Sequence, residues 1–163
     1  MRLAVVSDTH LPRGSRRIPA QCLAQLQTAD VILHAGDFTA LAVLEELETL
    51  GPPLYGVHGN MDDAEVRARL PAHTVVELAG KRIGMTHDPG PREGRGSRLV
   101  RRFPGCDAVV YGHTHLPELT THEGVWILNP GSPTERRRAP AHTMLVLELD
   151  GDRIEPTLVD LHE

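Results

Sequence analysis

Near its start the sequence reads RLAVVSDTH (residues 2–10), an apolar run that passes directly into a polar loop with Asp8 and His10. Such a run is typical of a strand, and the loop carries side chains that bind metal ions. The same arrangement occurs four more times. Residues 31–33 lead into HAGD (34–37), residues 54–57 into HGN (58–60), residues 82–85 into THD (86–88) and residues 108–111 into GHTH (112–115). These five strand ends decide the fold class.

Amphipathic helices are predicted between several of these strands, and this alternation indicates an α/β protein with largely parallel pairing. After residue 118 the pattern changes to short strands with turn signals, which predicts two packed sheets. The expected helices begin near Pro19, burying Cys22, Leu23 and Leu26, and continue over residues 39–50, from Asp62 to Pro71, and over residues 97–103. The expected late strands cover residues 118–122, 125–128, 143–149 and 153–159, with a hairpin turn at Asp150-Gly151.

The chain has 163 residues, of which 40% are hydrophobic and 24% charged. This fits a single domain over residues 1–163. No apolar run approaches the ~20 residues that cross a bilayer, and the first apolar run is unlike a signal peptide, so we expect a cytoplasmic protein without membrane contact. A formal charge of −5 and five aromatic residues give no strong signal for nucleic-acid binding. Cys22 and Cys106 lack metal-site spacing and are expected to be buried thiols.

Loops at the carboxyl ends of parallel strands converge, so the five polar loops are expected to meet. They supply oxygen and imidazole ligands and no thiolate, which suits Mn, Fe, Ni, Zn or similar ions. Seven ligands exceed the needs of one tetrahedral ion but match two ions that share a carboxylate. The predicted ligands are Asp8, His10, Asp37, Asn60, His87, His113 and His115.

Each motif alone also has a purely structural interpretation. Asp-x-His after a strand is weak evidence, Gly36-Asp37 could be a helix-entry turn, and Gly59-Asn60 could be a turn with positive φ. The two imidazoles of GHTH face one site only where the backbone is irregular. Five such loops at five strand ends favour a metal site.

Together these motifs resemble the calcineurin-like metallophosphoesterase superfamily, and NPGS (129–132) resembles the following loop in its small bacterial and archaeal phosphodiesterases. The resemblance spans residues 1 to about 135. It implies a four-layer α-β-β-α sandwich of two mixed sheets flanked by helices, with a di-metal site at the edge between the sheets. The motifs that carry it are DTH (8–10), GD (36–37), GNMD (59–62), His87 and GHTH (112–115).

The resemblance also implies a role for each ligand. Asp37 would bridge two ions, and a hydroxide held between them would attack a phosphate ester. Manganese is favoured, with iron, nickel or zinc as alternatives, and the implied substrate is a small phosphate ester, with nucleotides among the candidates. One ion would lie among Asp8, His10, Asp37 and His115, and the other among Asp37, Asn60, His87 and His113.

Two positions depart from the pattern of relatives. Met61 stands where many carry a His that is proposed to protonate the leaving oxygen, and Pro89 stands where some carry a second imidazole. The family resemblance and these missing donors favour phosphodiesters over phosphomonoesters. His58 could replace the donor or contact phosphate, but it could equally be a turn residue. The predicted catalytic residues are Asp37, Asn60 and His58, and the predicted substrate contacts are Asn60, Arg92 and Arg95.

Two further residues near the motifs, and the function as a whole, leave alternatives open. His34 is expected to pack beside the site, and Asp62 either orients Asn60 or caps a helix. The rival function is a catalytically weak metal-binding scaffold for protein interaction, as in the retromer subunit with this fold. The complete ligand set favours an enzyme. No inserted stretch is long enough to form a lid domain, so its site is expected to be shallow and uncapped. Homo-oligomerisation stays open.

Overall fold

The apolar run at residues 2–6 becomes the central strand of the first sheet in the computed structural model, which describes residues 1–162. Three parallel strands lead to the site, and an antiparallel hairpin completes the sheet. In the order β10-β9-β1-β2-β3, the strands are Arg153–Leu161, His142–Asp150, Arg2–Val6, Val31–His34 and Leu54–Gly56.

The second sheet is also mixed, because a parallel centre is flanked by two antiparallel edge strands. Its order is β4-β5-β6-β8-β7, and the strands are His73–Leu78, Lys81–Thr86, Ala108–Val110, Val125–Asn129 and Glu118–His122. The helices in the described part of the chain are α1 (Ala20–Thr28), α2 (Leu41–Glu48), α3 (Ala64–Arg69) and α4 (Arg95–Arg102).

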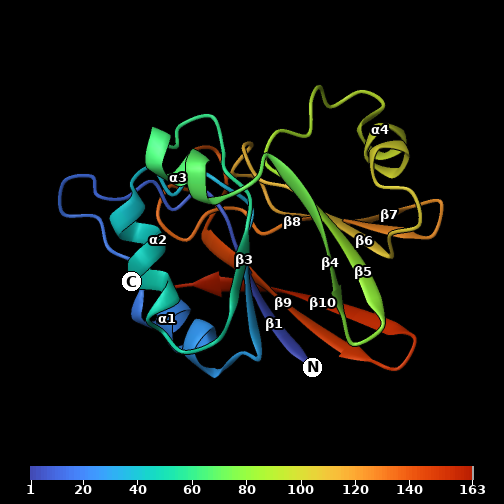
Figure 1. Cartoon of the computed structure of the whole chain (residues 1–163), viewed down its shortest axis with the longest axis horizontal. Helices are drawn as coiled ribbons and strands as arrows, with labels where there is room; N and C mark the ends of the chain where they lie inside the picture. The colour runs from blue at the N-terminus through green and yellow to red at the C-terminus, as the bar shows by residue number, and fades with distance from the viewer. Residues whose placement is uncertain (163) are drawn as a thin grey trace.

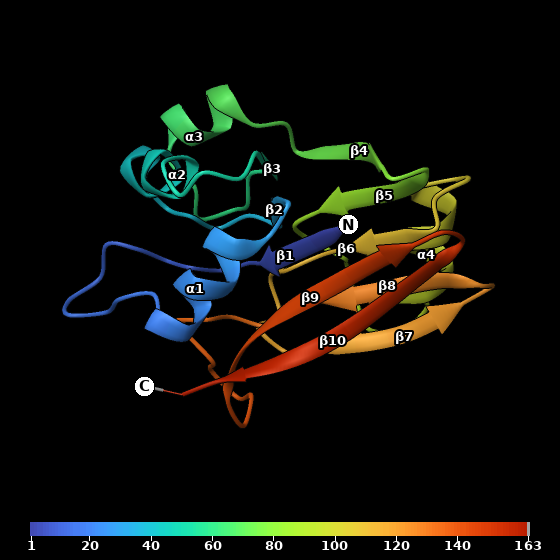
Figure 2. The ribbon, with the colours of Figure 1, turned by 90° about the horizontal axis from the view of Figure 1, so that it is seen from below.

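The period of two along each strand divides its side chains between two apolar layers. On β1, Leu3 and Val5 join the core between the sheets, whereas Ala4 and Val6 pack with α1 and α2. On β6, Val109 faces a third cluster with Leu99 of α4 and its neighbours. Figures 1 and 2 show α1, α2 and α3 on one side of the paired sheets and α4 on the other. The predicted four-layer sandwich is confirmed.

Several element boundaries differ from those expected. Strand β4 was not predicted; it is an edge strand with alternating exposure that hydrogen-bonds only to β5 within residues 1–162, so its sequence lacks a continuous apolar run. Helix α2 is two residues shorter at each end than expected. Helix α3 is capped by Asp63, whose side chain accepts a hydrogen bond from the Val66 N–H at 2.9 Å, and not by Asp62. Of the two roles offered for Asp62, the helix cap is therefore wrong by one residue.

Both cysteines are buried and unpaired within the described residues. Burial raises the pKa of the Cys22 thiol to about 12. None of the helices in residues 1–162 is long and apolar enough to cross a membrane.

Candidate metal centre

The predicted ligands follow five strands, and these strands come from both sheets. Asp8 and His10 follow β1, Asp37 follows β2 and Asn60 follows β3, whereas His87 follows β5 and the GHTH pair follows β6. The backbone is left-handed at most of these positions. The φ angles are 56° at Asp8, 44° at His10, 59° at Asp37, 72° at His113 and 59° at His115. Non-glycine residues rarely adopt this conformation, and strain of this kind gathers at functional sites.

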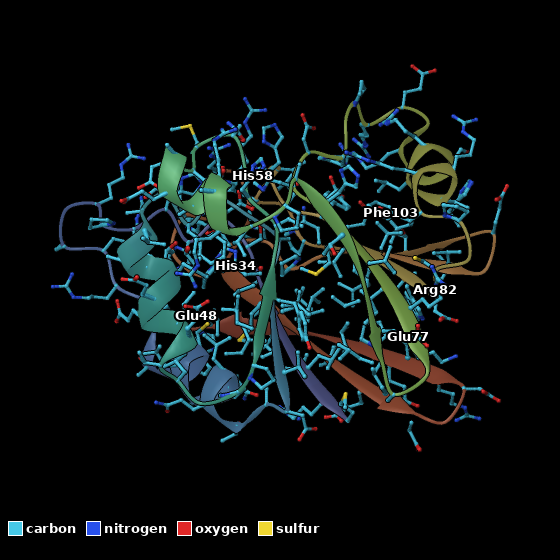
Figure 3. All side chains as sticks on the ribbon, viewed as in Figure 1. His34, Glu48, His58, Glu77, Arg82 and Phe103 are labelled. Carbon is cyan, nitrogen blue, oxygen red and sulfur yellow. The ribbon has the colours of Figure 1, made fainter. Side chains whose placement is uncertain are left out.

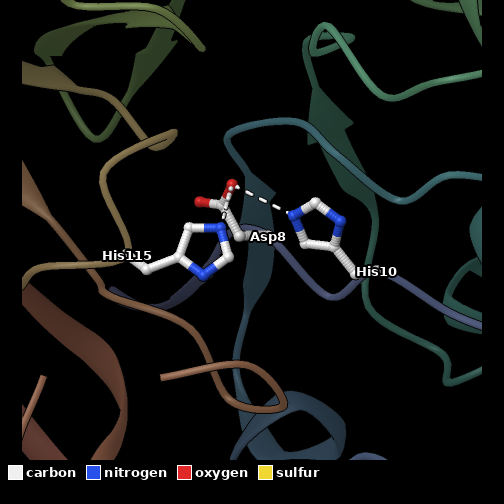
Figure 4. A group of neighbouring side chains, drawn as sticks. All are labelled: Asp8, His10 and His115. Carbon is white, nitrogen blue, oxygen red and sulfur yellow. Dashed lines mark ion pairs between the residues drawn. The ribbon is translucent and has the colours of Figure 1, made fainter. Parts of the chain in front are cut away.

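The first group of side chains contains Asp8, His10 and His115, all of them buried (Figure 4). The Oδ1 atom of Asp8 lies 3.3 Å from Nε2 of His115 and 3.6 Å from Nε2 of His10. Within residues 1–162, these three atoms have no hydrogen-bond partner. Buried polar atoms are normally paired, so three unpaired atoms aimed at one point fit a cation that would bind all of them.

The second group contains Asp37, Asn60, His87 and His113. Oδ2 of Asp37 lies 3.2 Å from Nε2 of His87 and 3.4 Å from Nε2 of His10, so this carboxylate stands between the two groups. Oδ1 of Asn60 lies 3.1 Å from both Nε2 of His87 and Nδ1 of His113. Separations of about 3 Å are those of neighbouring ligands around one ion. The donor set is oxygen and imidazole nitrogen throughout, which fits two divalent cations.

Three imidazoles are oriented through their other ring nitrogen. Nδ1 of His87 donates to the Ala35 carbonyl at 2.7 Å, and Nδ1 of His115 donates to the Glu135 carbonyl. Nδ1 of His10 lies 3.8 Å from the Glu135 carboxylate, which also pairs with Arg13 at 3.3 Å. Each contact turns Nε2 toward the centre, as outer partners of metal-binding histidines commonly do.

The histidines of the centre favour the anionic form of the Asp8 and Asp37 carboxylates. Burial raises the pKa of Asp8, but contacts with His10, His115 and His87 outweigh it, and the net effect lowers this pKa. The same competition lowers the pKa of Asp37, where His87 outweighs burial. Burial in turn lowers the pKa of His87, but the two carboxylates reverse the effect and raise it. Two anionic carboxylates in one buried pocket suit the binding of a cation.

Asp62 joins two of the site loops. Its carboxylate accepts hydrogen bonds from the backbone N–H groups of Asp37 at 3.0 Å, Thr39 at 2.7 Å and Gly59 at 2.6 Å. Burial raises the pKa of this carboxyl, although the backbone donors oppose the rise. Asp62 thus positions the loops that follow β2 and β3, and Asn60 lies in the second of them, so the contacts favour the orienting role over the capping role.

At two motif positions only glycine fits, because a side chain there would collide with neighbouring atoms. A Cβ atom on Gly59 would collide with Oδ1 of Asp37, and one on Gly112 would collide with Oγ of Ser7 and lie 2.8 Å from Oδ2 of Asp8. Neither glycine has a positive φ angle. The expected turn at Gly59 is therefore a close approach of backbone to a ligand, because only glycine leaves room for the carboxylate.

The NPGS loop supports the site from behind. Nδ2 of Asn129 donates to the Gly112 carbonyl at 3.2 Å, and Oγ of Ser132 donates to the Asp8 carbonyl at 2.7 Å. The hydroxyl of Thr134 donates to the Thr9 carbonyl at 2.6 Å. Ser132 lies in the NPGS motif but was given no role, and Thr134 and Glu135 were not predicted, because their only local signal was their position after that motif.

The other predicted residues are placed unequally. His58 is half-buried beside α3 (Figure 3), lines a cavity with Asn60 and His87, and has a buried Nδ1 without a hydrogen-bond partner within residues 1–162. Met61 is exposed. His34 is fully buried and stacks on Phe38, with ring centroids 3.5 Å apart.

The predicted substrate contacts Arg92 and Arg95 line a different hollow, which contains neither Asn60 nor His87. Arg95 is held there by the Tyr111 hydroxyl at 3.1 Å and lies 3.8 Å from the Glu118 carboxylate. The structure therefore does not bring these two arginines together with the ligand cluster.

Comparison with known proteins agrees with this geometry. Residues 1–152 match the calcineurin-like phosphoesterase superfamily domain. A probable metallophosphoesterase of Methanothermobacter thermautotrophicus is 36% identical over 163 residues, covering 98% of this chain and 92% of that protein. A phosphodiesterase of Methanocaldococcus jannaschii is 26% identical over 144 residues, covering 80% and 83%.

Among solved structures, Vps29 of Entamoeba histolytica complexed with zinc is 25% identical and has a TM-score of 0.77, covering 98% of this chain and 99% of that one. The fold of almost the whole chain is therefore the one that the motifs imply. Because the family pattern covers residues 1–152 and its ordered motifs converge on one centre, the chain belongs to the calcineurin-like phosphoesterase superfamily.

Proposed function

We propose that this chain is a metal-dependent phosphodiesterase whose centre holds two divalent ions. The observation that carries the proposal is the set of buried atoms without hydrogen-bond partners in residues 1–162, namely Oδ1 of Asp8 and Nε2 of His10 and His115. Asp37 lies 3.4 Å from His10 and 3.2 Å from His87, nearer to both than Asp8 at 3.6 and 3.9 Å, which supports its role as the shared ligand. Manganese is our proposed metal, with iron, nickel and zinc as alternatives, and residues 1–163 are our proposed single domain.

The chain's own residues have distinct tasks in this mechanism. When bound, the two ions supply a lowered pKa for coordinated water and an attraction for the phosphoryl oxygens. Asp8 and Asp37 remain anionic and hold the centre's charge in place. Asn60 and His113 lie at its more exposed side, where a phosphate ester would enter. His58 reaches the same cavity as Asn60, which supports a role in contacting phosphate or protonating the leaving oxygen.

A phosphodiester is the proposed substrate class. Met61 is exposed and carries no proton to donate, so alkoxide-like leaving groups gain little help at this position. Esters with phenol-like leaving groups should therefore react fastest. The phosphodiesterase relative supports the same preference.

The test compares bis-p-nitrophenyl phosphate with p-nitrophenyl phosphate as substrates of the manganese-loaded protein. We expect faster hydrolysis of the diester, and an Asp37→Asn variant with activity at least about 100-fold lower and reduced bound metal. Asp152→Asn, in the exposed turn between β9 and β10, is the matched control and should behave as the wild type.

Equal turnover by wild type and Asp37→Asn would overturn the proposed hydrolysis. If both proteins were inactive and only the wild type retained metal, the scaffold function would replace the enzymatic one.

A further inference from the structure

A cavity of about 440 Å³ opens directly beside the candidate metal centre. Two proposed ligands form part of its wall, so a substrate held at the metals would extend into it. The rest of the wall comes from helix α3, helix α4 and the loops after β3 and β5. The residues that matter for its chemistry are His58, Asn60, Arg67, His87, Arg98 and Arg102.

The cavity carries an excess of positive charge. Within residues 1–162, Arg67, Arg98 and Arg102 have no carboxylate within 4.0 Å of their guanidinium nitrogens. One acid, Asp88, also lines the cavity, and its Oδ1 accepts a hydrogen bond from the Gly90 N–H at 2.8 Å. The three arginines and Asp88 together give the cavity a net charge of about +2, which suits a ligand that carries at least two negative charges.

The arginines are held in place by bonds that leave their charge uncompensated. Arg67 donates from Nε to the Asp62 carbonyl at 2.9 Å and from Nη2 to the Asn60 carbonyl at 3.0 Å. Arg98 donates from Nε and Nη2 to the Pro89 carbonyl at 3.1 and 2.9 Å, from Nη1 to the Glu93 carbonyl at 3.3 Å, and from Nη2 to the Pro91 carbonyl, so it gives the cavity its charge and few free N–H donors. Carbonyl groups orient a guanidinium without neutralising it, so less side-chain freedom is lost when an anion binds.

We propose that this cavity binds a second phosphoryl group of the substrate, so that the preferred substrate is a phosphodiester whose organic part carries a further phosphate. The inference rests on the proposed phosphodiesterase function and specifies its substrate class. Guanidinium groups match the charge and geometry of phosphate oxygens, and the cavity volume lies in the range of small-molecule sites. The specificity residues are thus Arg67, Arg98 and Arg102, in place of Arg92 and Arg95.

Two chromogenic esters that differ by a single phosphate test this inference. One is thymidine 3′-(p-nitrophenyl phosphate), and the other is the same compound phosphorylated at its 5′ oxygen. With the manganese-loaded wild type, we expect kcat/KM about tenfold higher for the 5′-phosphorylated ester, chiefly through a lower KM. The ratio should fall at least about threefold in Arg102→Gln and in Arg67→Gln.

Arg101→Gln is the matched control, because Arg101 is the neighbouring exposed arginine of α4 and does not line the cavity. It should keep the wild-type ratio, which separates a local effect from a change in net charge. Arg102 is also exposed and makes one hydrogen bond within the described residues, to the Asp88 carbonyl at 3.4 Å, so its replacement should leave the fold intact. Arg67→Gln provides a second variant, from helix α3 instead of α4.

The outcomes distinguish this inference from the proposed function. Hydrolysis of both esters with equal kcat/KM would overturn the second phosphate site and leave the phosphodiesterase intact. If neither ester is hydrolysed, calorimetric titration with thymidine 3′,5′-bisphosphate and thymidine 3′-phosphate decides. Tighter binding of the bisphosphate that is lost in Arg102→Gln would support the site without the activity, whereas equal affinities would overturn both.

Discussion

At the scale of single residues, the centre depends on two glycines that have no side chain as well as on the side chains that would bind metal. Gly59 and Gly112 leave space that the carboxylates of Asp37 and Asp8 occupy. A methyl group at either position would push a proposed ligand away from its place. The motif glycines are therefore part of the proposed metal site, although they offer no ligand atom themselves.

Replacement of Gly59 by alanine tests this role. We expect Gly59→Ala to lose bound metal and to destabilise the fold by about 1–3 kcal/mol, because the added Cβ has no room beside Asp37. Gly105→Ala is the control: nothing lies within 4 Å of its Cβ, so only its φ of 75° costs about 1 kcal/mol, and metal content should persist. Metal analysis and urea unfolding give both quantities, and a fully metal-loaded Gly59→Ala protein would contradict the steric role.

His34 gives a second prediction at this scale, because it is a buried imidazole that the fold keeps neutral. The Gly36 N–H donates to its Nδ1 at 3.1 Å, and its Nε2 lies 3.1 Å from the Thr9 hydroxyl. Burial lowers the pKa of His34 to about 3. His34 is therefore protonated below about pH 6.5 in the unfolded chain but stays neutral in the folded chain. Its contribution to the free energy of unfolding is lost as the pH falls from about 6.5 toward 3.

Unfolding of metal-free protein at several pH values measures the effect. Below pH 6.5 the free energy of unfolding should fall more steeply in the wild type than in His34→Gln, by up to about 1.4 kcal/mol per pH unit. Comparison of the two slopes removes the contribution of the other histidines. Identical slopes would contradict the neutral state of His34.

At the scale of elements, adjacent acids around helix α3 do different work. Asp63 caps the helix through one hydrogen bond, whereas Asp62 holds the loops after β2 and β3 through three. Their sequence context is nearly identical. The difference arises because the Asp62 side chain is buried against two loops from elsewhere in the chain.

Alanine at each of these positions should separate the two roles. Asp62→Ala leaves three backbone donors without their acceptor, so we expect a loss of about 3 kcal/mol or more and reduced metal content. Asp63→Ala removes only a helix cap and should cost about 1 kcal/mol with metal retained. Urea denaturation with metal analysis checks both, and equal losses would argue against Asp62 as the link between the loops.

At the scale of the whole molecule, the proposed ligands connect the two sheets. Asp8, His10, Asp37 and Asn60 follow strands of the first sheet, whereas His87 and the GHTH histidines follow strands of the second. Bound metal would thus hold the sandwich together at one edge. Any ion that binds the folded chain and not the unfolded chain stabilises it through mass action.

Metal removal should therefore lower the unfolding temperature. At a manganese concentration about 100 times its dissociation constant, the expected stabilisation is about 2.7 kcal/mol. For a chain of this size that corresponds to about 5–10 °C in Tm. Differential scanning calorimetry with manganese and then with excess EDTA measures the shift, and Asp37→Asn should show little of it. A wild-type Tm that is insensitive to both additions would count against the site.

The sequence by itself determined the alternation of strands and helices, the two-sheet class and the ligand-bearing loops. It could do so because strand periodicity, turn residues and DTH or GHTH motifs are local signals. It did not identify edge strand β4, whose exposed face interrupts the apolar pattern, and the helix cap that it offered, Asp62, was wrong by one residue.

Only the tertiary structure decided which residues surround the proposed ligands. Glu135 lies 3.8 Å from His10, and Thr134 bonds to a carbonyl 125 residues away in the chain. The tertiary structure also placed Arg67, Arg98 and Arg102 at the cavity beside the centre, and Arg95 at the Tyr111 hydroxyl. The physical reason is that a side chain's partner depends on how distant loops pack, whereas its local sequence records only the element that carries it.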